Sequence, residues 1–340
     1  MLRRLAAAAS ALVLAVGLAA CGGGDDGSET TTSTSGATDA FPVSVTHKYG
    51  TTEITKEPKR IVVVGLVEQD ALLSLGVVPV ATTEWFGGHP GAIWPWAKDE
   101  LGDKTVPTVL TNTDGLQLEK IAAQKPDLIL GIYSGLTKEE YDKLSKFAPT
   151  IAQPKGGIDY GVSWQELTTM VGTAVGRKAQ AEKVIADVEG TIAKAKSAHP
   201  EFAGKTGLMA TNWEGYYVYG TKDPRGRFLT DLGFTLPAGL DAVTGKEFGA
   251  SISRERTDLL GVDALVWLVP DPAADAKKIQ SDSLYAKLGL TKEGRDLYLK
   301  EDESLGGATS FISVLSLPYL IDELVPKLAA AADGDPATTA

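Results

Sequence analysis

Aromatic and arginine side chains follow several predicted strands, and these residues are the best suited in the sequence to hold a ligand. Aromatic side chains in loops are costly to expose unless they contact something, and here they are dense. In open α/β sheets, ligands bind beyond the carboxyl ends of the strands. We therefore predict a binding site lined by Trp85, Trp94, Trp96 and Tyr133 from the first half of the chain and by Trp213, Tyr216, Arg225, Arg227 and Phe311 from the second.

Some of these residues also have a purely structural interpretation. Trp94 and Trp96, separated by one proline, could close their own loop. The stretch from Tyr216 to Tyr219 alternates as any half-buried strand does. Arg227 could cap a helix or pair with Asp231 instead of meeting a ligand.

The sequence offers little that could carry out catalysis. Its three histidines, His47, His89 and His199, are far apart and lack the spacing of metal ligands. It contains neither the G-x-S-x-G motif of serine hydrolases nor the phosphate-binding motif G-x-x-x-x-G-K. Its one cysteine is Cys21. We predict that the chain is not an enzyme and has no metal site. Because Asp and Glu are plentiful, a lipid-anchored extracellular glycan hydrolase with paired carboxylates stays open as an alternative.

Length and charge narrow the remaining classes. The chain has 340 residues, of which 43% are hydrophobic, so it can form two domains with buried cores. Its formal net charge of −11 argues against a nucleic-acid-binding protein, which needs a basic surface.

The first residues are typical of a bacterial lipoprotein signal. Arg3 and Arg4 precede an apolar stretch, and Leu18-Ala19-Ala20-Cys21 forms a cleavage site that ends in the lone cysteine. We predict a signal peptide over 1–20 and lipidation at Cys21, which would anchor the protein outside the cytoplasmic membrane. Residues 21–41 are rich in Gly, Ser, Thr and Asp and are predicted to be a disordered tether. Residues 329–340 are predicted to be a disordered tail.

Buried strands alternate with short helices on both sides of one long helical segment. This alternation predicts two α/β lobes with largely parallel sheets, over 42–160 and 201–328. The segment 161–200 between them begins with Ser163 and Glu166, which are spaced as in a capping box. Its second helix, over 177–198, has a one-sided apolar stripe of Val184, Ile185, Val188, Ile192 and Ala195. We predict that this helix joins the two lobes.

A short internal repeat supports two matching lobes. Glu119 and Glu255 each lie in the first turn of a short predicted helix, and an Asp and a buried strand follow eight residues on. The two lobes would therefore present two matching carboxylates. Alternatively, both residues reflect the general preference of acidic residues for helix amino termini.

Several stretches together resemble the substrate-binding lipoproteins of ABC importers for ferric siderophores, which are related to cobalamin- and haem-binding proteins. The resemblance covers about residues 43–328. It rests on Pro58-Lys-Arg-Ile-Val-Val-Val-Gly65, Asp70-Ala-Leu-Leu-Ser-Leu-Gly-Val-Val-Pro-Val80, Glu119 to Leu130, Val171-Gly-Thr-Ala-Val-Gly-Arg177, Ala181-Glu182, Arg227-Phe228, Leu232-Gly233 and Ser253-Arg-Glu255.

The resemblance implies a fold, a ligand and partners. The fold would be the helical-backbone periplasmic-binding-protein fold (cluster A, class III), with two lobes, one rigid connecting helix and little hinge closure. A ferric siderophore would bind between the lobes with its iron already chelated, so that no cofactor is needed. Glu119 and Glu255 would dock on arginines of a permease that works with a separate ATPase, and the protein would act as a monomer in iron transport. Haem or cobalamin stays open as the ligand, with Tyr133 or His89 as a possible axial ligand of haem.

Overall fold

The computed structural model describes residues 39–111, 115–212 and 215–338. The predicted signal peptide, Cys21, most of the predicted tether and Trp213 lie outside the described residues. Within the described ranges, no helix combines the length and the apolar character needed to cross a membrane.

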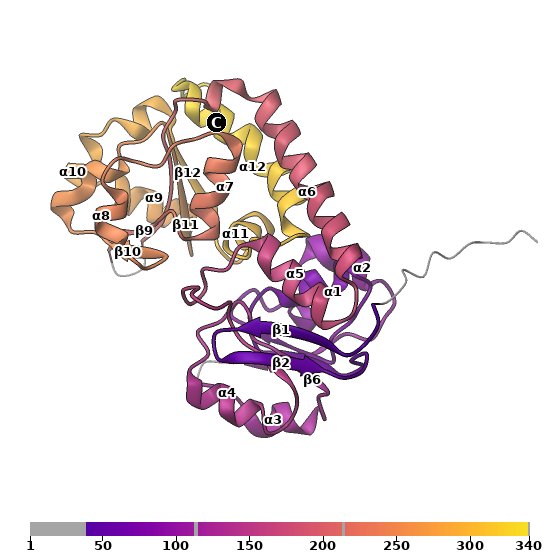
Figure 1. Ribbon diagram of the computed structural model, residues 1–340. Coiled ribbons are helices and arrows are strands. Elements are labelled where there is room, and N and C mark those ends of the chain that lie inside the picture. Colours follow the sequence, from indigo (N-terminus) through magenta and orange to yellow (C-terminus); the bar gives the residue numbers. More distant parts are fainter. Residues whose placement is uncertain (1–38, 112–114, 213–214, 339–340) are drawn as a thin grey trace, which may run out of the picture. The chain divides into compact units, whose positions relative to one another are not determined.

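A five-stranded parallel sheet forms the centre of the first lobe (Figure 1). Its strand order is β5-β4-β3-β6-β7. The β-branched strand β3 is buried on both faces, as expected for a central strand covered by helices. The strands of this sheet are β3 (Ile61–Val63), β4 (Ala81–Glu84), β5 (Thr108–Thr111), β6 (Leu128–Leu130) and β7 (Thr150–Ile151).

An antiparallel hairpin and short helices complete this lobe. The hairpin consists of β1 (Val43–His47) and β2 (Gly50–Ile54). The helices are α1 (Glu68–Ser74), η1 (Pro90–Ala92), η2 (Pro95–Ala97), α2 (Lys98–Leu101), α3 (Leu118–Ala123) and α4 (Lys138–Leu144).

Strand β4 begins only at Ala81, several residues after the end of α1. Gly76, with φ of +73°, ends the preceding helix in a conformation that favours glycine. Pro79 then has no N–H to donate to a neighbouring strand. The segment between them is therefore a connection rather than the first half of the strand.

The second lobe contains a mixed five-stranded sheet of order β10-β9-β8-β11-β12. Strands β8, β11 and β12 are parallel, whereas β9 pairs antiparallel with β8 and β10. The strands are β8 (Gly207–Thr211), β9 (Tyr217–Tyr219), β10 (Gly249–Ser251), β11 (Ala264–Val269) and β12 (Asp296–Lys300). The helices are α7 (Pro224–Leu232), α8 (Leu240–Thr244), η4 (Arg254–Leu260), α9 (Pro272–Gln280), α10 (Ser283–Ala286), η5 (Leu290–Glu293) and α11 (Ser304–Ser310).

Two consecutive helices, α5 (Trp164–Ala174) and α6 (Lys178–Ala198), connect the lobes, and η3 (Pro200–Phe202) follows them. Ser163 caps α5 by accepting a hydrogen bond from the Glu166 N–H at 3.1 Å. The apolar stripe of α6 is buried where predicted, at Val188 and Ile192, and the helix contacts α5, α7 and α12. This confirms an α/β fold of two lobes joined by a long helix.

The last helix, α12 (Ser316–Asp333), runs beside α6 and contacts η2 of the first lobe (Figure 1). It extends into the predicted tail as far as Asp333, and Ala331 and Ala332 are buried in the core. The prediction that the disordered tail begins at residue 329 is therefore wrong. Alanines have high helix propensity, and tertiary contacts fix this last turn.

A buried carboxylate ties the amino-terminal helix α1 to the start of α12. Asp70 accepts hydrogen bonds from the Ser313 hydroxyl at 2.5 Å and from the Trp96 indole N–H at 2.8 Å, and only 2% of it is exposed. The Ser313 hydroxyl also accepts the backbone N–H of Ser316, the first residue of α12. Burial raises the pKa of Asp70 to about 6, although these two hydrogen bonds favour the charged form.

We predict a pH-dependent stability difference between the wild type and Asp70→Asn. Because the pKa of Asp70 is 3.8 ordinarily and about 6 in the fold, protonation stabilises the folded state. That stabilisation is complete below about pH 4 and is lost as the pH rises through about 6. The variant is neutral throughout and can still accept both hydrogen bonds. From about pH 4 to about pH 7, the wild type should lose up to about 3 kcal/mol of unfolding free energy relative to Asp70→Asn, measured by denaturant titration.

The matched control is Asp187→Asn on the exposed face of α6, where Asp187 pairs with Lys183. Its unfolding free energy should follow that of the wild type at every pH, because surface pairs contribute little. Parallel pH profiles for the wild type and Asp70→Asn would show that Asp70 does not titrate differently in the folded and unfolded chains.

Candidate functional site between the lobes

A row of aromatic rings lies where loops of the first lobe meet the second lobe. Tyr160, in the loop after β7, is at its centre. Its ring centroid lies 6.4 Å from that of Trp85, 5.7 Å from that of Tyr133 and 6.5 Å from that of Phe248 in the second lobe. Trp85 and Tyr133 follow β4 and β6, so all three first-lobe residues come from the carboxyl ends of parallel strands.

The row continues along β9 of the second lobe. The Phe248 ring lies 6.1 Å from that of Tyr217, and the Tyr217 ring lies 5.4 Å from that of Tyr219. Trp85 is 65% exposed, so one end of the row is open to solvent. We call Trp85, Tyr133, Tyr160, Tyr217, Tyr219 and Phe248 the inter-lobe cluster.

The predicted residue Tyr216 lies on the opposite face of β9 from this cluster. Successive side chains of a strand point to opposite faces, and the Tyr216 ring packs 5.3 Å from Trp267 and 6.3 Å from Tyr285 in the core behind the sheet. We therefore replace Tyr216 by its neighbours Tyr217 and Tyr219 in the candidate site. The alternation along β9 indicated that neighbours would diverge, but not which face the ligand would use.

Arg225 joins the cluster as half of an ion pair. Its guanidinium lies over the Tyr219 ring, 3.7 Å from the centroid. Its Nε and Nη2 donate to the two carboxylate oxygens of Asp223 at 2.7 and 2.8 Å, and Asp223 is fully buried. Burial opposes the charge, but the carboxylate outweighs it and raises the pKa of Arg225. Asp223 also accepts the Arg225 backbone N–H and so caps α7.

The tyrosine hydroxyls of the cluster are neutral at physiological pH. Burial raises the pKa of Tyr217 to about 12 and also raises the pKa of Tyr133, Tyr160 and Tyr219. Neutral phenols can donate a hydrogen bond to an oxygen of a ligand and present an apolar ring beside it.

Arg227, which was predicted to bind ligand, instead holds α7 to the segment before α5. Its Nη1 donates to the Lys222 carbonyl at 2.7 Å, and its Nη2 donates to the carbonyls of Gly161 and Val162 at 3.0 and 3.1 Å. These contacts occupy both terminal nitrogens. The structure thus gives Arg227 a positioning role, and these hydrogen bonds are neither a helix cap nor a pair with Asp231.

Three other predicted ligand residues, Trp94, Trp96 and Phe311, form a second aromatic group in which the lobes pack together. Trp94 is 4% exposed and stacks on Trp96 with centroids 5.0 Å apart, and its ring lies 5.6 Å from that of Phe311. A Cβ at Gly307 of α11 would lie only 2.3 Å from the Trp94 ring, so this glycine allows the close approach. These residues serve the inter-lobe core rather than an open site.

A buried carboxylate positions Tyr133 in the cluster. The Glu68 Oε1 accepts the backbone N–H groups of Ile132 and Tyr133 at 2.5 and 2.9 Å, and Glu68 is fully buried. Burial raises the pKa of Glu68, whereas these backbone donors lower it. Gly65 makes room for this arrangement, since a Cβ there would lie 2.0 Å from the same oxygen. Glu68 thus joins the loops after β3 and β6.

The remaining predicted residues are distributed as follows. Glu119 lies in the first turn of α3 and Glu255 in η4, and both are exposed. Neither forms an ion pair with another described residue. Trp213 and Cys21 lie outside the described residues. Tyr133 and His89, considered as haem ligands, lie in different groups, because the His89 ring packs 4.3 Å from that of Trp94.

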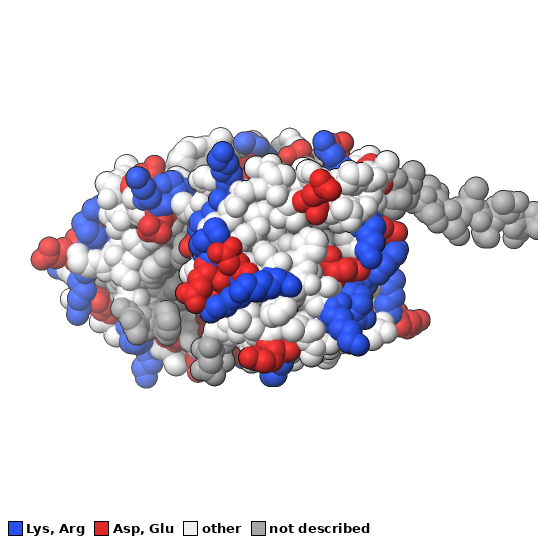
Figure 2. Space-filling view, turned by 60° about the horizontal axis from the view of Figure 1, so that its bottom comes forward, with Lys and Arg blue, Asp and Glu red and all other residues white. Residues whose placement is uncertain are grey.

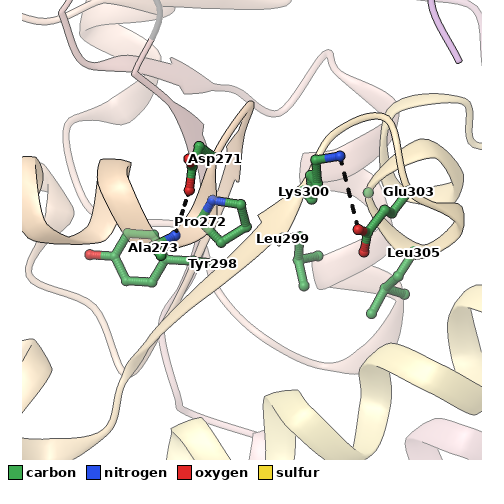
Figure 3. A pocket seen from close by; sticks show the side chains of 9 residues that line it. Asp271, Pro272, Ala273, Tyr298, Leu299, Lys300, Glu303 and Leu305 are labelled. Carbon is green, nitrogen blue, oxygen red and sulfur yellow. Dashed lines mark hydrogen bonds and ion pairs between the residues drawn. The ribbon is translucent and has the colours of Figure 1, made fainter.

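A separate pocket of about 350 Å³ opens beside the carboxyl ends of β11 and β12 (Figure 3). Asp271 and Tyr298 line one side, and Lys300, Glu303 and Leu305 line the other. The Asp271 carboxylate accepts the Ala273 N–H at 3.1 Å, and Lys300 lies 4.0 Å from Glu303. Its charged groups are already paired, and it shares no residue with the inter-lobe cluster.

The described residues contain no group of three or more His, Cys, Asp or Glu side chains that could hold a metal ion. His47 hydrogen-bonds with the Thr52 hydroxyl at 2.9 Å, and His199 pairs with Glu201 at 2.7 Å. His47 and His199 therefore have local structural partners.

The chain is similar to proteins of known class. The family model described as periplasmic binding protein matches residues 67–303, well over half of the chain. A probable siderophore-binding lipoprotein of Bacillus subtilis, YfiY, is 32% identical over 198 residues, which make up 57% of each chain and so less than two thirds of that relative. The ferric enterobactin-binding periplasmic protein FepB of Escherichia coli is 28% identical over 84% of this chain and 90% of its own.

Solved structures agree with this similarity. A periplasmic solute-binding protein of Mycobacterium smegmatis is 36% identical with a TM-score of 0.74, and the match covers 86% of this chain and 99% of that one. PiaA of Streptococcus pneumoniae, solved in complex with ferrichrome, is 28% identical with a TM-score of 0.77 over the same shares. The chain therefore belongs to the periplasmic binding protein family, whose members bind substrates rather than convert them.

Proposed function

We propose that this protein captures a ferric siderophore between its two lobes and delivers it to an ABC importer for iron uptake. The observation that carries the proposal is the inter-lobe cluster, a row of aromatic rings from both lobes that has the Arg225 guanidinium at one end and the exposed Trp85 at the other. Binding between the two lobes suits a carrier, because both lobes then contact the ligand and neither lobe encloses it completely.

The chemistry of the cluster suits such a ligand. A ferric siderophore is large, has apolar rims and carries iron-bound oxygen atoms with partial negative charge. Aromatic rings cover the rims, while the tyrosine hydroxyls and the Arg225 Nη1 can donate hydrogen bonds to the oxygens. Nη1 makes no hydrogen bond with any described residue, so this donor is available. The iron arrives chelated and needs no ligand from the protein.

The names of similar proteins support the iron complex over the other ligands considered. Among relatives are the Fe(3+) dicitrate-binding protein FecB of Escherichia coli and the iron(3+)-hydroxamate-binding protein YxeB of Bacillus subtilis. Haem would need an axial ligand, and Tyr133 is packed by Tyr160 while His89 lies in the other aromatic group. We therefore do not carry haem or cobalamin forward.

We predict that a ferric siderophore quenches the tryptophan fluorescence of the full chain carrying Cys21→Ser, with saturation at submicromolar concentration. Trp85→Ala should weaken binding about tenfold or more, because an aromatic ring against the ligand contributes on the order of 1–2 kcal/mol. Arg225→Lys should also weaken it, since an ammonium cannot replace the fork that holds Asp223 and faces the ligand.

Phe147→Ala provides the matched control. Phe147 is 42% exposed and lies outside the inter-lobe cluster. Its replacement should leave affinity unchanged. Binding to no ferric siderophore, or equal weakening in Phe147→Ala and Trp85→Ala, would contradict the proposed site.

We further propose that Glu119 and Glu255 dock the two lobes on the permease. Both carboxylates are exposed, lie on different lobes and form no ion pair with described residues. A charge-assisted contact at each lobe would orient the carrier and speed association without a dry interface.

The double variant Glu119→Ala, Glu255→Ala should therefore bind its iron complex with unchanged affinity but fail to support uptake of radioactive iron in cells. Glu139→Ala, which removes an exposed carboxylate paired with Lys143 on α4, is the control and should support normal uptake. Persistent uptake in the double variant would reject the docking role.

Lipidation at Cys21 would hold the protein at the outer face of the cytoplasmic membrane. The support is the signal sequence that ends in this residue and the similarity to a probable siderophore-binding lipoprotein. We predict that cells incorporate radioactive palmitate into the wild type but not into Cys21→Ala, which should be released from the membrane fraction. Label in Cys21→Ala would place the lipid elsewhere.

A further inference from the structure

Asp223 lies where it can control which ligand charges the inter-lobe cluster accepts. Building on the proposed function, we propose that Asp223 is a specificity-determining residue: by neutralising Arg225, it makes the site favour an electroneutral or cationic ferric chelate over a polyanionic one. The chemical class that fits is the ferric tris-hydroxamate, which is neutral at iron, rather than the ferric tris-catecholate, which is a trianion.

The ion pair is built as one unit. Asp223 is fully buried and Arg225 is 9% exposed, and two hydrogen bonds of 2.7 and 2.8 Å join them. Such a fork-to-fork pair has almost no net charge at the distance of a ligand, although its outer nitrogen can still donate a hydrogen bond. Because Asp223 also caps α7 through the Arg225 N–H, the pair is fixed to the helix start.

The other cations near the cluster are already occupied. Arg227 donates to three backbone carbonyls. Lys222 donates to the Gly245 carbonyl at 2.9 Å, and Lys48 pairs with Asp159 at 2.8 Å. The cation that lies directly against a ring of the cluster is Arg225, and this is the one that a buried carboxylate neutralises.

Carboxylates outnumber cations around the four tyrosines. After burial, which is the main cause of their raised pKa values, the charged groups that act on these phenols are two arginines and six carboxylates: Arg225, Arg227, Asp223, Glu247, Glu301, Asp159, Glu140 and Glu68. The phenols stay neutral in this field. The site thus offers neutral hydrogen-bond donors beside the Arg225–Asp223 pair.

The neutralised arginine should make the site bind a neutral iron complex more tightly than an anionic one. A trianion that enters the cluster loses hydration, and the arginine against the rings is already neutralised by Asp223, so its desolvation is poorly compensated. A neutral chelate avoids that cost and gains the ring contacts and hydrogen bonds. The face shown in Figure 2 carries interspersed acidic and basic side chains rather than a continuous basic surface, and the chain has a net charge of −11. A net negative charge does not steer anions toward the protein over long range.

The test measures affinity by tryptophan quenching in the full chain carrying Cys21→Ser, at low and high salt. One pair of probes is ferrichrome, which is neutral, and ferric enterobactin, which is a trianion. A second series keeps the chelate constant: ferrioxamine B, which is cationic, its neutral N-acetyl derivative and its anionic N-succinyl derivative. The variants are Asp223→Asn and Asp223→Ser, both of which can still cap α7. The control is Asp187→Asn on α6, which removes one negative charge at an exposed position outside the inter-lobe cluster.

We expect the wild type to bind ferrichrome about 100-fold or more tightly than ferric enterobactin and to disfavour the succinyl derivative. In both Asp223 variants this preference should fall about tenfold or more, mainly through tighter binding of the anions, and the gain should shrink at high salt. Asp187→Asn should keep the wild-type preference.

Three outcomes would overturn the proposal. One is a wild type that binds ferric enterobactin as tightly as ferrichrome, a result that needs no variant to fold. Another is an unchanged preference in an Asp223 variant that keeps the wild-type circular dichroism and melting temperature. The third is no quenching by any ferric complex, which would remove the proposed function as well, whereas tight binding of the trianion would leave that function standing.

Discussion

The packing of α6 and α12 against each other is the constraint on which the binding site depends. The apolar stripe of α6 is buried against α5, α7 and α12, and α12 continues to η2 of the first lobe. The Asp70 contacts to Ser313 and Trp96 then fix the start of α12 to α1. Two helices and a buried polar link therefore connect the lobes, so the aromatic rings that face each other across them are held in place before any ligand arrives. Such preorganisation lowers the entropic cost of binding.

Three polar side chains near the site position backbone or charge. Glu68 joins two loops of the first lobe, Arg227 joins α7 to the segment before α5, and Asp223 holds Arg225. Each of these groups has its hydrogen-bond partners, which is the condition under which a buried charge is tolerated. Replacing one partner would leave the other buried without a hydrogen-bond partner. The geometry of the site therefore depends on keeping both members of each pair.

The sequence was sufficient to predict the fold class and the connecting helix, because buried β-branched strands and a one-sided apolar stripe are local patterns. The family was predicted from the resemblance of several short stretches to its members. The site was harder. Trp94 and Phe311 contact each other, but nothing local distinguishes an aromatic residue that meets the other lobe from one that meets a ligand. Alternation along β9 could not show that Tyr217 and Tyr219, rather than Tyr216, face the first lobe. Tyr160 follows a strand as Trp85 does and could have been included on the same criterion. The Asp-Pro start of α7 is typical of a helix cap, but the prediction did not include this cap, and the pattern does not indicate that the same carboxylate neutralises Arg225.

A carrier of the proposed kind must release its ligand as well as bind it. Affinity built from several buried cations around an anion would mainly slow dissociation, because differences in affinity among related complexes lie largely in the dissociation rate. A site of the proposed kind would obtain its affinity from aromatic contact area and from single hydrogen bonds of neutral phenols and one neutralised arginine. These contacts could be lost one at a time when the lobes move apart. The exposed carboxylates at Glu119 and Glu255 would then act on the lobes from outside, so that docking and ligand binding use different residues and can be changed independently.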